Sequence, residues 1–479
     1  MTAFQRFKRT FVGDRAFYGD VARLIVPIII QMFVTSFVNM LDNVMVGRLG
    51  TDEISGVAVA NQLVMVFNMC IFGGVAGPGI FGAQFFGARD MEGARNTFRI
   101  KLWICFMILA TAAVAILGFG PLLIGQFLKG EGDPASASRI LAFALDYIGV
   151  SLIGFLPFAL TTCYCGTLRE SGETMLPMKA GIAAVFVNLI GNYTLIYGHF
   201  GFPRMGVVGA AVATVLSRFV ELGIVLYSVH VRRNERFSFM HDAFHTLKVP
   251  FDLLKAVLRK GSPLLLNEML WSVGIATLVQ SYSLRGLNVL AALNIATTVN
   301  NLFNMFFLSM GNAIATMVGQ HLGANRMDEA KRDVWRLMAF SAAMCLVIGS
   351  LMALLSPVFP RLYDVGDEVR ELATKFIIAM ALLMPLHSIA HACYFTLRSG
   401  GSTLMTFIFD SAYVWAVNIP LARLMVHRTT LSIEYLYPLC ELAGLTKIIL
   451  GIIIVRSGVW VKNIVSKQTD AVLPGGAES

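Results

Sequence analysis

Two stretches of this sequence share one pattern: Gln84-Phe-Phe-Gly87-Ala88-Arg-Asp-Met91-Glu92 and, half a chain later, Gln320-His-Leu-Gly323-Ala324-Asn-Arg-Met327-Asp328. Both have the form Gln-x-x-Gly-Ala-x-x-Met followed by an acidic residue. The shift that superposes them also carries Pro27 onto Pro263. Landmarks that recur in the same order at one separation indicate a duplicated chain, in which each half forms one copy of the same structural unit.

The composition around these stretches is that of a membrane protein. Of 479 residues, 56% are hydrophobic and 14% are charged, the mean hydropathy is +0.70, and about 25% charged residues are usual in soluble domains. The net charge of +9 would suggest a nucleic-acid partner in a soluble protein. Here the basic residues lie in short loops between apolar runs, so they indicate membrane topology and no nucleic acid is expected.

Apolar runs follow one another from Val21 to Val455 almost without interruption. A bilayer core about 30 Å thick needs roughly 20 apolar residues per helix. Runs bounded by charges, Gly and Pro predict twelve membrane-spanning helices, at residues 21–46, 53–80, 99–120, 137–163, 176–198, 206–229, 262–284, 288–318, 333–356, 370–395, 402–426 and 433–455.

The predicted fold is an all-α integral membrane protein with two six-helix bundles. An even number of helices per copy relates the bundles by a pseudo-twofold axis along the membrane normal. Residues 1–20 form an N-terminal segment, 21–229 the N-lobe, 230–261 a connector with a short surface helix from Phe251, 262–456 the C-lobe and 457–479 a tail. Lys and Arg gather on the side that holds both termini, which predicts cytoplasmic termini in a plasma membrane, specifically a bacterial inner membrane. A monomer is expected.

Ionisable residues inside predicted spans mark candidate functional sites, because a charge at membrane depth is costly. In the first helix, spacings of four, four and three residues place one polar stripe on a single face: Gln31, Thr35, Asn39 and Asp42. This face is expected to line a cleft. Asp42 is the candidate for a carboxylate that binds and releases a proton or Na⁺; the alternative is a helix-end residue hydrated by the outer loop.

The fifth and sixth helices supply neutral oxygen ligands for the same site. Asn188 and Asn192 are one turn apart, and Thr214 follows on the next helix. Amide and hydroxyl oxygens suit a hard cation such as Na⁺ at Asp42 as well as a hydrogen-bonded proton site. Interhelical hydrogen bonds that only hold the bundle together are the alternative.

The second half carries a different set of polar residues. Glu268 and Asp410 are the candidate carboxylates for an ion or a cationic substrate, and Lys447 is positioned to neutralise one of them as a structural ion pair. His387 and His391 form an i, i+4 pair that suggests polar lining or a proton relay and not a zinc site. A neutral stripe predicted to line the cleft comprises Asn294, Thr297, Asn301 and Asn304.

Neither an enzyme nor a channel is favoured by these features. The sequence has no His-Glu-x-x-His zinc motif, no Gly-x-Ser-x-Gly elbow and no P-loop. A channel has no need of two duplicated lobes with prolines inside their helices, as at Pro27 and Pro263. No cofactor is expected apart from a coupling ion.

The chain resembles the multidrug and toxic compound extrusion (MATE) family over about residues 20–460. The resemblance is carried by the Gln-x-x-Gly-Ala motif in both halves and by five further segments: Asn39-Met-Leu-Asp42-Asn-Val-Met-Val-Gly47, Asn188-Leu-Ile-Gly-Asn192, Gly206-Val-Val-Gly-Ala-Ala-Val-Ala-Thr214, Gly261-Ser-Pro263-Leu-Leu-Leu-Asn-Glu268 and Leu397-Arg-Ser-Gly-Gly401.

This resemblance implies a secondary active antiporter that exports organic cations or amphiphilic drugs in exchange for Na⁺ or H⁺. It matches Asp42, Asn188, Asn192 and Thr214 to the family's N-lobe ion site, with Asn192 where some members carry a second aspartate. Glu268 matches a helix 7 glutamate, whereas His387 falls at or near a family aspartate. The competing function is a flippase for a lipid-linked or amphiphilic metabolite, for which the acidic intramembrane residues are a poor match.

Overall fold

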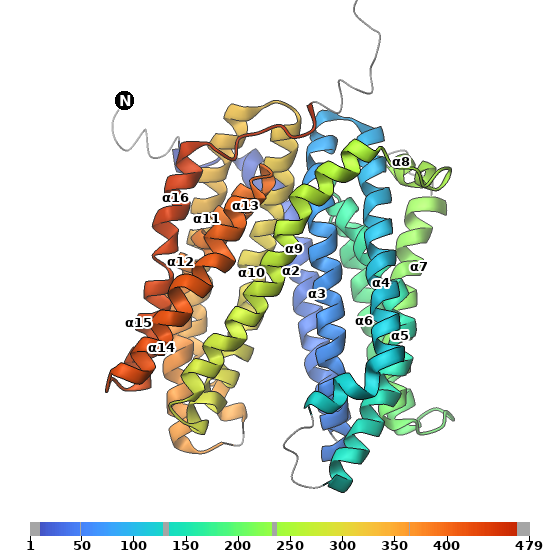
Figure 1. Cartoon of the computed structure of the whole chain (residues 1–479), viewed down its shortest axis with the longest axis vertical. Coiled ribbons are helices and arrows are strands. Elements are labelled where there is room, and N and C mark those ends of the chain that lie inside the picture. Colours follow the sequence, from blue (N-terminus) through green and yellow to red (C-terminus); the bar gives the residue numbers. More distant parts are fainter. Residues whose placement is uncertain (1–9, 48, 128–133, 232–236, 364, 467–479) are drawn as a thin grey trace, which may run out of the picture. The chain divides into compact units, whose positions relative to one another are not determined.

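The computed structural model describes residues 10–47, 49–127, 134–231, 237–363 and 365–466. Within these ranges the chain is helical and has no strand (Figure 1). Twelve helical segments of the described chain are long and apolar enough to cross a membrane, which confirms the predicted all-α membrane fold and its number of spans.

The spans of the first half are α2 (Arg15–Gly47), α3 (Thr51–Ala88), α4 (Met91–Phe127), α5 (Pro134–Glu170), α6 (Met175–Tyr197) and α7 (Gly206–Leu226), which continues into the π-helix η1 (Tyr227–Val231). The second half contains α9 (Phe251–Ser283), α10 (Leu287–Gly323), α11 (Met327–Leu355), α12 (Asp367–Ser399), a span from α13 (Thr403–Phe407) through η5 (Ile408–Ala412) and η6 (Val414–Asn418) to α14 (Ile419–Arg428), and a last span of α15 (Ile433–Gly444) and α16 (Lys447–Ser457).

Most helices extend beyond their predicted ends. α4, for example, begins at Met91 where the sequence predicted residue 99. Charged residues beyond the apolar run do not stop a helix; a backbone reversal does. In both copies of the duplicated motif the helix stops at a residue with positive φ, Arg89 (φ 59) after α3 and Asn325 (φ 57) near the end of α10, the left-handed conformation that commonly terminates helices.

The predicted connector is wrong in one respect: the surface helix expected from Phe251 is not separate from the seventh span. Both belong to one helix, α9, with Pro263 inside it. The predicted connector ends at Gly261, but membrane helices tolerate internal glycine and proline when neighbouring groups satisfy the freed backbone groups. α2 likewise begins at Arg15, inside the predicted N-terminal segment. Residues 1–9, 232–236 and 467–479 of the predicted termini and connector lie outside the described chain.

The chain groups into two compact units. The C-terminal unit contains Met1–Ile29, Ala83–Asp90 and Lys255–Ser479, and the N-terminal unit contains Ile30–Gly82 and Met91–Leu254. The first part of α2 and the end of α3 thus belong with the helices of the second half. The lobe boundaries predicted from the sequence stay a prediction.

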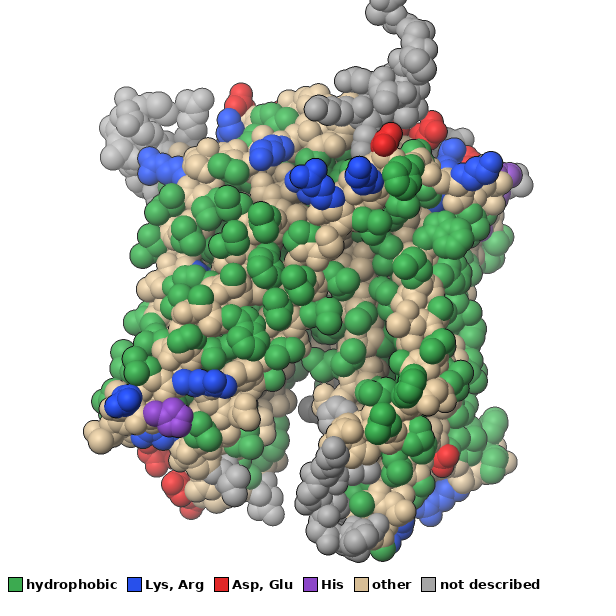
Figure 2. Space-filling model, in the orientation of Figure 1, with side chains coloured by type: hydrophobic (Ala, Val, Ile, Leu, Met, Phe, Trp, Pro, Cys, Tyr) green, Lys and Arg blue, Asp and Glu red, His purple; other side chains and the backbone are tan. Residues whose placement is uncertain are grey.

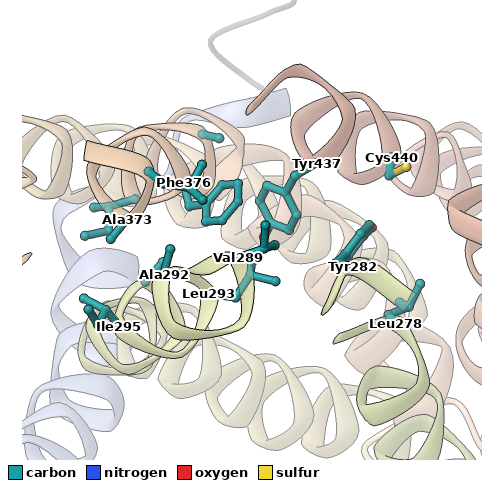
Figure 3. Close-up of a cluster of buried hydrophobic side chains, with 14 of the residues drawn as sticks. Leu278, Tyr282, Val289, Ala292, Leu293, Ile295, Ala373, Phe376, Tyr437 and Cys440 are labelled. Atoms are coloured by element: carbon teal, nitrogen blue, oxygen red, sulfur yellow. The ribbon is translucent and has the colours of Figure 1, made fainter. Parts of the chain in front are cut away.

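In the C-terminal unit, aromatic and aliphatic side chains from α9, α10, α12 and α15 point toward one another (Figure 3). The Tyr437 ring packs edge-on against Tyr282, with centroids 5.4 Å apart, and lies 4.9 Å from Phe376. Hydrophobic side chains also cover much of the visible surface, and charged residues gather near helix ends (Figure 2). Large exposed apolar side chains such as Leu117, Leu354 and Val347 are suited to contact with lipid.

The duplicated motif brings its two copies together within the C-terminal unit. A Cβ built on Gly87 would lie 1.9 Å from the backbone oxygen of Gln320, and one built on Gly323 would lie 1.8 Å from that of Gln84. The contact is therefore reciprocal, with each glycine facing the other copy's glutamine. Gln84 also donates to the Ser399 and Lys462 carbonyls and accepts from the Ile464 N–H, so this motif anchors the segment after α16.

Candidate ion-binding sites

Asp42, near the end of α2, is the centre of a polar cluster in the N-terminal unit. The Asn192 amide donates to Asp42 Oδ1 at 2.5 Å. With its nitrogen facing the carboxylate, Asn188 donates to both Asp42 oxygens at 3.0 and 2.9 Å and accepts from the Thr214 hydroxyl at 3.2 Å. The opposite orientation would set an amide oxygen against the carboxylate, so we assign the first. The structure thus brings together the four residues predicted for the N-lobe site.

Close helix packing positions these side chains. A Cβ on Gly191 of α6 would lie 2.8 Å from the Ala213 side chain, and one on Gly209 of α7 would lie 2.6 Å from the Leu195 oxygen. Small residues at these points let the two backbones approach, as is common between membrane helices. The Tyr197 hydroxyl, which donates to the Met45 carbonyl at 2.9 Å, ties the end of α6 to the end of α2.

Two further residues of this cluster escaped the sequence analysis. The buried Tyr147 of α5 has its hydroxyl beside Thr214 and close enough to Asp42 for electrostatic interaction. Arg218 of α7, one turn beyond Thr214, interacts electrostatically with Asp42 and pairs with Glu221 at 3.1 Å. A tyrosine in an apolar run gives no signal, but Arg218 four residues after Thr214 on one helix face was a signal that could have been used.

The hydrogen-bond donors around Asp42 are suited to an ionised carboxylate. One nearby oxygen, Oδ1 of Asn192, is suited to bind a cation. Asn192 is 1% exposed, and among the described residues its Oδ1 has no hydrogen-bond partner. A buried carbonyl oxygen without a donor costs free energy, which a cation bound between it and the Asp42 carboxylate would recover. Carboxylate and amide oxygens are the ligands that hard cations prefer.

The remaining members of the predicted α2 stripe have mixed environments. Gln31 accepts a hydrogen bond from Arg169 Nη2 at 3.1 Å and packs against Gly181 of α6, so its amide is engaged within the unit. Thr35 is half-buried, and the side chain of Asn39 lies outside the described part of the structure. The stripe therefore serves partly in helix packing.

The C-terminal unit contains a second polar network. The Tyr394 hydroxyl donates to Glu268 Oε1 at 2.9 Å, and Asn267 Nδ2 donates to Asp410 Oδ2 at 3.1 Å and reaches the Tyr394 hydroxyl at 3.5 Å. Lys447 Nζ lies 3.0 Å from Asp410 Oδ1, with both side chains about 15% exposed. The predicted residues Glu268, Asp410 and Lys447 are thus joined through Asn267 and Tyr394, which the sequence analysis did not single out.

The other predicted residues of this half lie at the edges of the network. His387 Nε2 is 3.7 Å from Glu441 Oε2, whereas His391 packs its ring 4.6 Å from Phe307. On α10, Asn294, Thr297 and Asn301 are exposed and Asn304 is half-buried. None of these residues joins the Asp410–Lys447 pair through a described hydrogen bond.

A groove of about 710 Å³ lies elsewhere in the N-terminal unit, lined by residues that include Lys179, Tyr227 and Phe237. It contains none of the predicted site residues. The polar clusters, and not this groove, are therefore the candidate sites.

The MatE family model matches this chain twice, over residues 27–194 and again over residues 263–424. The two matches begin at Pro27 and Pro263, the prolines that the internal repeat superposes. This chain belongs to the MatE family. The matched segments together cover well over half of its length and contain the carboxylates of both polar networks, whereas Thr214 and Lys447 lie beyond them.

Similar MatE proteins have been described in several bacteria. One is 26% identical over 414 residues, 85% of each chain, and is named "Probable multidrug resistance protein NorM" in Thermotoga maritima. Another, "Multidrug resistance protein PmpM" of Pseudomonas aeruginosa, is 27% identical over 85% of this chain and 83% of its own. The MatE chain described here is thus similar over most of its length to multidrug resistance proteins.

Solved structures show the same fold. One described as "Outward-facing conformation of a multidrug resistance MATE family transporter of the MOP superfamily" has a TM-score of 0.82 at 22% identity and covers 93% of this chain and 96% of its own. A second, of a MOP superfamily transporter from Pyrococcus furiosus whose description reads "Reverse polarity of binding pocket suggests different function", has a TM-score of 0.81 at 21% identity, covering 95% and 98%. This MatE protein is a multi-pass membrane protein of that fold.

Proposed function

We propose that this protein is a secondary active multidrug efflux antiporter that exports organic cations or amphiphilic drugs in exchange for a cation bound at Asp42. The observation that carries the proposal is the half-buried Asp42 carboxylate next to the buried Asn192 oxygen, which has no hydrogen-bond partner among the described residues. Membership of the MatE family and the names of its relatives support efflux of drugs.

Exchange requires that binding of the ion and binding of the drug oppose each other. With the site empty, Asp42 carries a negative charge at membrane depth, which favours an organic cation nearby. A bound Na⁺ or proton neutralises that charge and removes the attraction for the organic cation. Binding of the ion and binding of the drug therefore lower each other's affinity. The change of access from one side of the membrane to the other then has to follow neutralisation of the Asp42 carboxylate on α2.

Of the two coupling ions, Na⁺ is favoured by the chemistry of the donor set. A proton needs only the carboxylate, whereas Na⁺ needs several oxygen ligands, and the Asn192 Oδ1 atom supplies one beside Asp42. Rotation of the Asn188 amide would supply another. A single carboxylate with Na⁺ forms a neutral pair, which suits a site where the second position is Asn192 and not an aspartate.

The C-terminal network is assigned a supporting role in this proposal. Lys447 neutralises Asp410 directly, so that carboxylate is already paired without an imported ion. Glu268, which accepts a hydrogen bond from Tyr394, is the one candidate in this network without a cationic partner at salt-bridge distance in the described chain. It is therefore the residue of this half to compare with Asp42.

We propose that the protein lies in the plasma membrane as a bacterial inner-membrane protein, with both termini in the cytoplasm, and acts as a monomer. The excess of Lys and Arg on one side of the spans supports this orientation. Membrane lipid and small cationic or amphiphilic molecules are the partners that such an arrangement requires.

The test is transport in proteoliposomes with Na⁺ and H⁺ gradients imposed separately. An inwardly directed Na⁺ gradient is expected to drive export of a cationic dye by the wild type, and Asp42→Asn is expected to abolish the gradient-driven component. Asp367→Asn is the matched control, since Asp367 is an exposed carboxylate at the start of α12. Gradient-driven export that persists in Asp42→Asn would overturn the site assignment.

Two further arms of the experiment separate the alternatives. Driving by the proton gradient alone would identify H⁺ as the coupling ion. Driving by neither gradient would overturn antiport itself. An anionic dye belongs in the same series, because one structural neighbour is described as having a binding pocket of reversed polarity; preferential export of the anionic dye would contradict the proposed substrate class.

A further inference from the structure

A cluster of metal-ligand side chains lies in the segment between the two halves, apart from both intramembrane networks. The segment comprises α8 (Ser238–His241), η3 (Asp242–Phe244) and His245. One donor atom from each of His241, Asp242 and His245 lies within 4.8 Å of the others. Asp242 Oδ1 is at the centre, 4.0 Å from His241 Nδ1 and 4.0 Å from His245 Nε2.

We propose that His241, Asp242 and His245 form a Zn²⁺ site. Zinc binds imidazole nitrogen and carboxylate oxygen at about 2.0–2.2 Å in tetrahedral geometry, which places ligand atoms about 3.4 Å apart. The observed 4.0 Å separations therefore need contraction by less than about 1 Å. The histidine side chains are 51% and 75% exposed, so they are free to make this adjustment.

The chemistry of the ligands selects among the common metals. Two imidazoles and one carboxylate suit zinc, whereas Mg²⁺ and Ca²⁺ prefer ligands that are all oxygen. Three protein ligands leave the fourth position to water, as in open zinc sites. His230 is not in the set: its Nε2 lies 2.9 Å from the Tyr164 hydroxyl, although its ring is 5.5 Å from that of His241.

Two arginines of α4 hold the segment in place. Arg95 Nη2 donates to Asp242 Oδ2 at 3.0 Å, which leaves Oδ1 directed toward the histidines. Arg99 Nε donates to the Ala243 carbonyl at 3.0 Å. Outer partners of this kind orient metal-binding carboxylates, and their loss typically weakens metal binding about 10- to 100-fold. Arg95 is therefore assigned as a positioning residue.

The positive charge of these arginines sets a limit on the affinity. Arg95 is paired with Asp242, and Glu92 lies close enough to Arg99 for their charges to interact. The repulsion of Zn²⁺ is thus reduced but not removed. We therefore expect zinc to bind reversibly and with lower affinity than in closed sites with four protein ligands. The occupancy of the site in the segment between the halves should then follow the concentration of free zinc.

The test is Zn²⁺ binding by the full-length protein in detergent, purified without a histidine tag and measured by equilibrium dialysis with metal analysis. One zinc per chain is expected in the wild type. The double variant His241→Ala/His245→Ala should lose it. His427→Ala is the matched control, because His427 is an exposed histidine on α14 in the other unit, and it should retain the zinc.

Arg95→Gln is expected to weaken zinc binding by about tenfold or more, and Arg95→Lys to restore part of it because the cation beside Asp242 returns. Equal zinc uptake by the wild type and the double variant, or no uptake by either, would overturn the site. Unchanged affinity in Arg95→Gln would overturn the positioning role of Arg95. Neither result depends on transport, so the zinc site and the proposed antiport stand or fall separately.

Discussion

The Asp410–Lys447 pair shows how single charges are accommodated inside the C-terminal unit. Both side chains are about 15% exposed and 3.0 Å apart, and Asn267 donates to the other Asp410 oxygen. Desolvation of two charges offsets much of their attraction, so such a pair adds little to stability by itself. Removal of one partner is different, because it leaves the other charge buried and unpaired.

Lys447→Met is therefore expected to lower the free energy of unfolding by about 3 kcal/mol. The double variant Lys447→Met/Asp410→Asn should recover most of this loss, since no unpaired charge remains. Thermal or denaturant unfolding of the wild type, Lys447→Met, Asp410→Asn and the double variant in one detergent measures the coupling. If the two single losses simply added in the double variant, the pair would not be interacting as described.

Tyr147 allows a prediction for the N-terminal site. Tyr147→Phe removes the hydroxyl beside Thr214 and keeps the buried ring, so the fold should be retained. Coupled efflux should fall roughly fivefold to tenfold, in line with the net value of about 1 kcal/mol for a hydrogen bond. Tyr435→Phe, at an exposed tyrosine, is the control. Wild-type efflux by Tyr147→Phe would exclude its hydroxyl from the site.

For single residues, the sequence predicted the charged and amide side chains of the two sites better than it predicted the residues that contact them. Asp42, Asn188 and Asn192 stand out because polar residues are rare in apolar runs, and helical spacing places Asn188 and Asn192 on one face of α6. Tyr147 and Tyr394 could not be found in this way, because tyrosine is common in apolar helices and its role depends on tertiary contacts from other helices. An ion pair of Lys447 with one of the carboxylates was among the alternatives that the sequence offered. The position of Asn267 between Glu268 and Asp410 could not be predicted from it.

Among the helices, α9 shows where sequence reasoning about boundaries fails. The predicted connector ends at Gly261 and Pro263 lies inside the predicted seventh span, yet one helix runs through both from Phe251. A proline stops a helix only when its missing hydrogen bond and its clash with the preceding turn are not accommodated. Whether neighbouring helices accommodate them is a property of the packing, which residue types alone do not specify.

The contact between α3 and α10 is the element-scale feature with the clearest requirement for glycine. Gly323→Ala would place a methyl group about where the Gln84 carbonyl lies, since the built Cβ is 1.8 Å from that oxygen. The helices have to separate, and overpacking of this kind costs about 1–3 kcal/mol. We expect a corresponding loss of thermal stability, measured by fluorescence-detected unfolding in detergent.

Gly118→Ala on α4 is the matched control, because a Cβ at Gly118 has no atom of the described residues within 4 Å. That substitution should be neutral or stabilising by about 0.5–1 kcal/mol, the usual gain of Ala over Gly inside a helix. Gly87→Ala should behave like Gly323→Ala, because the contact is reciprocal. A neutral effect at both Gly87 and Gly323 would contradict the close approach.

For the molecule as a whole, the duplication explains the scaffold but not the chemistry. The MatE model matches both halves from equivalent prolines, and both copies of the motif contain a left-handed residue at the end of a helix. The polar sites do not repeat: Asp42 has no carboxylate at its equivalent position, which is Leu278. Scaffold residues were therefore predictable from the repeat, whereas the function of each half had to be argued from its own side chains.

The orientation of the whole chain gives the last prediction. The Arg95–Asp242 contact places the start of α4 and the segment between the halves at one membrane face, and the Gln84–Ile464 hydrogen bond does the same for the end of α3 and the segment after α16. From the distribution of Lys and Arg, we expect these segments to lie on the cytoplasmic side of the membrane. The turn between α6 and α7, with Phe200 80% exposed, then lies outside.

Reporter fusions test this orientation directly. Alkaline phosphatase fused after Phe200 should be active, because it folds only outside the cytoplasm, whereas green fluorescent protein fused after Leu247 should fluoresce. Exchanging the two reporters supplies the control at each position, since each should then be silent. The opposite pattern would invert the topology; the proposed zinc segment would then face the exterior, and Asp42 would lie at the cytoplasmic end of α2.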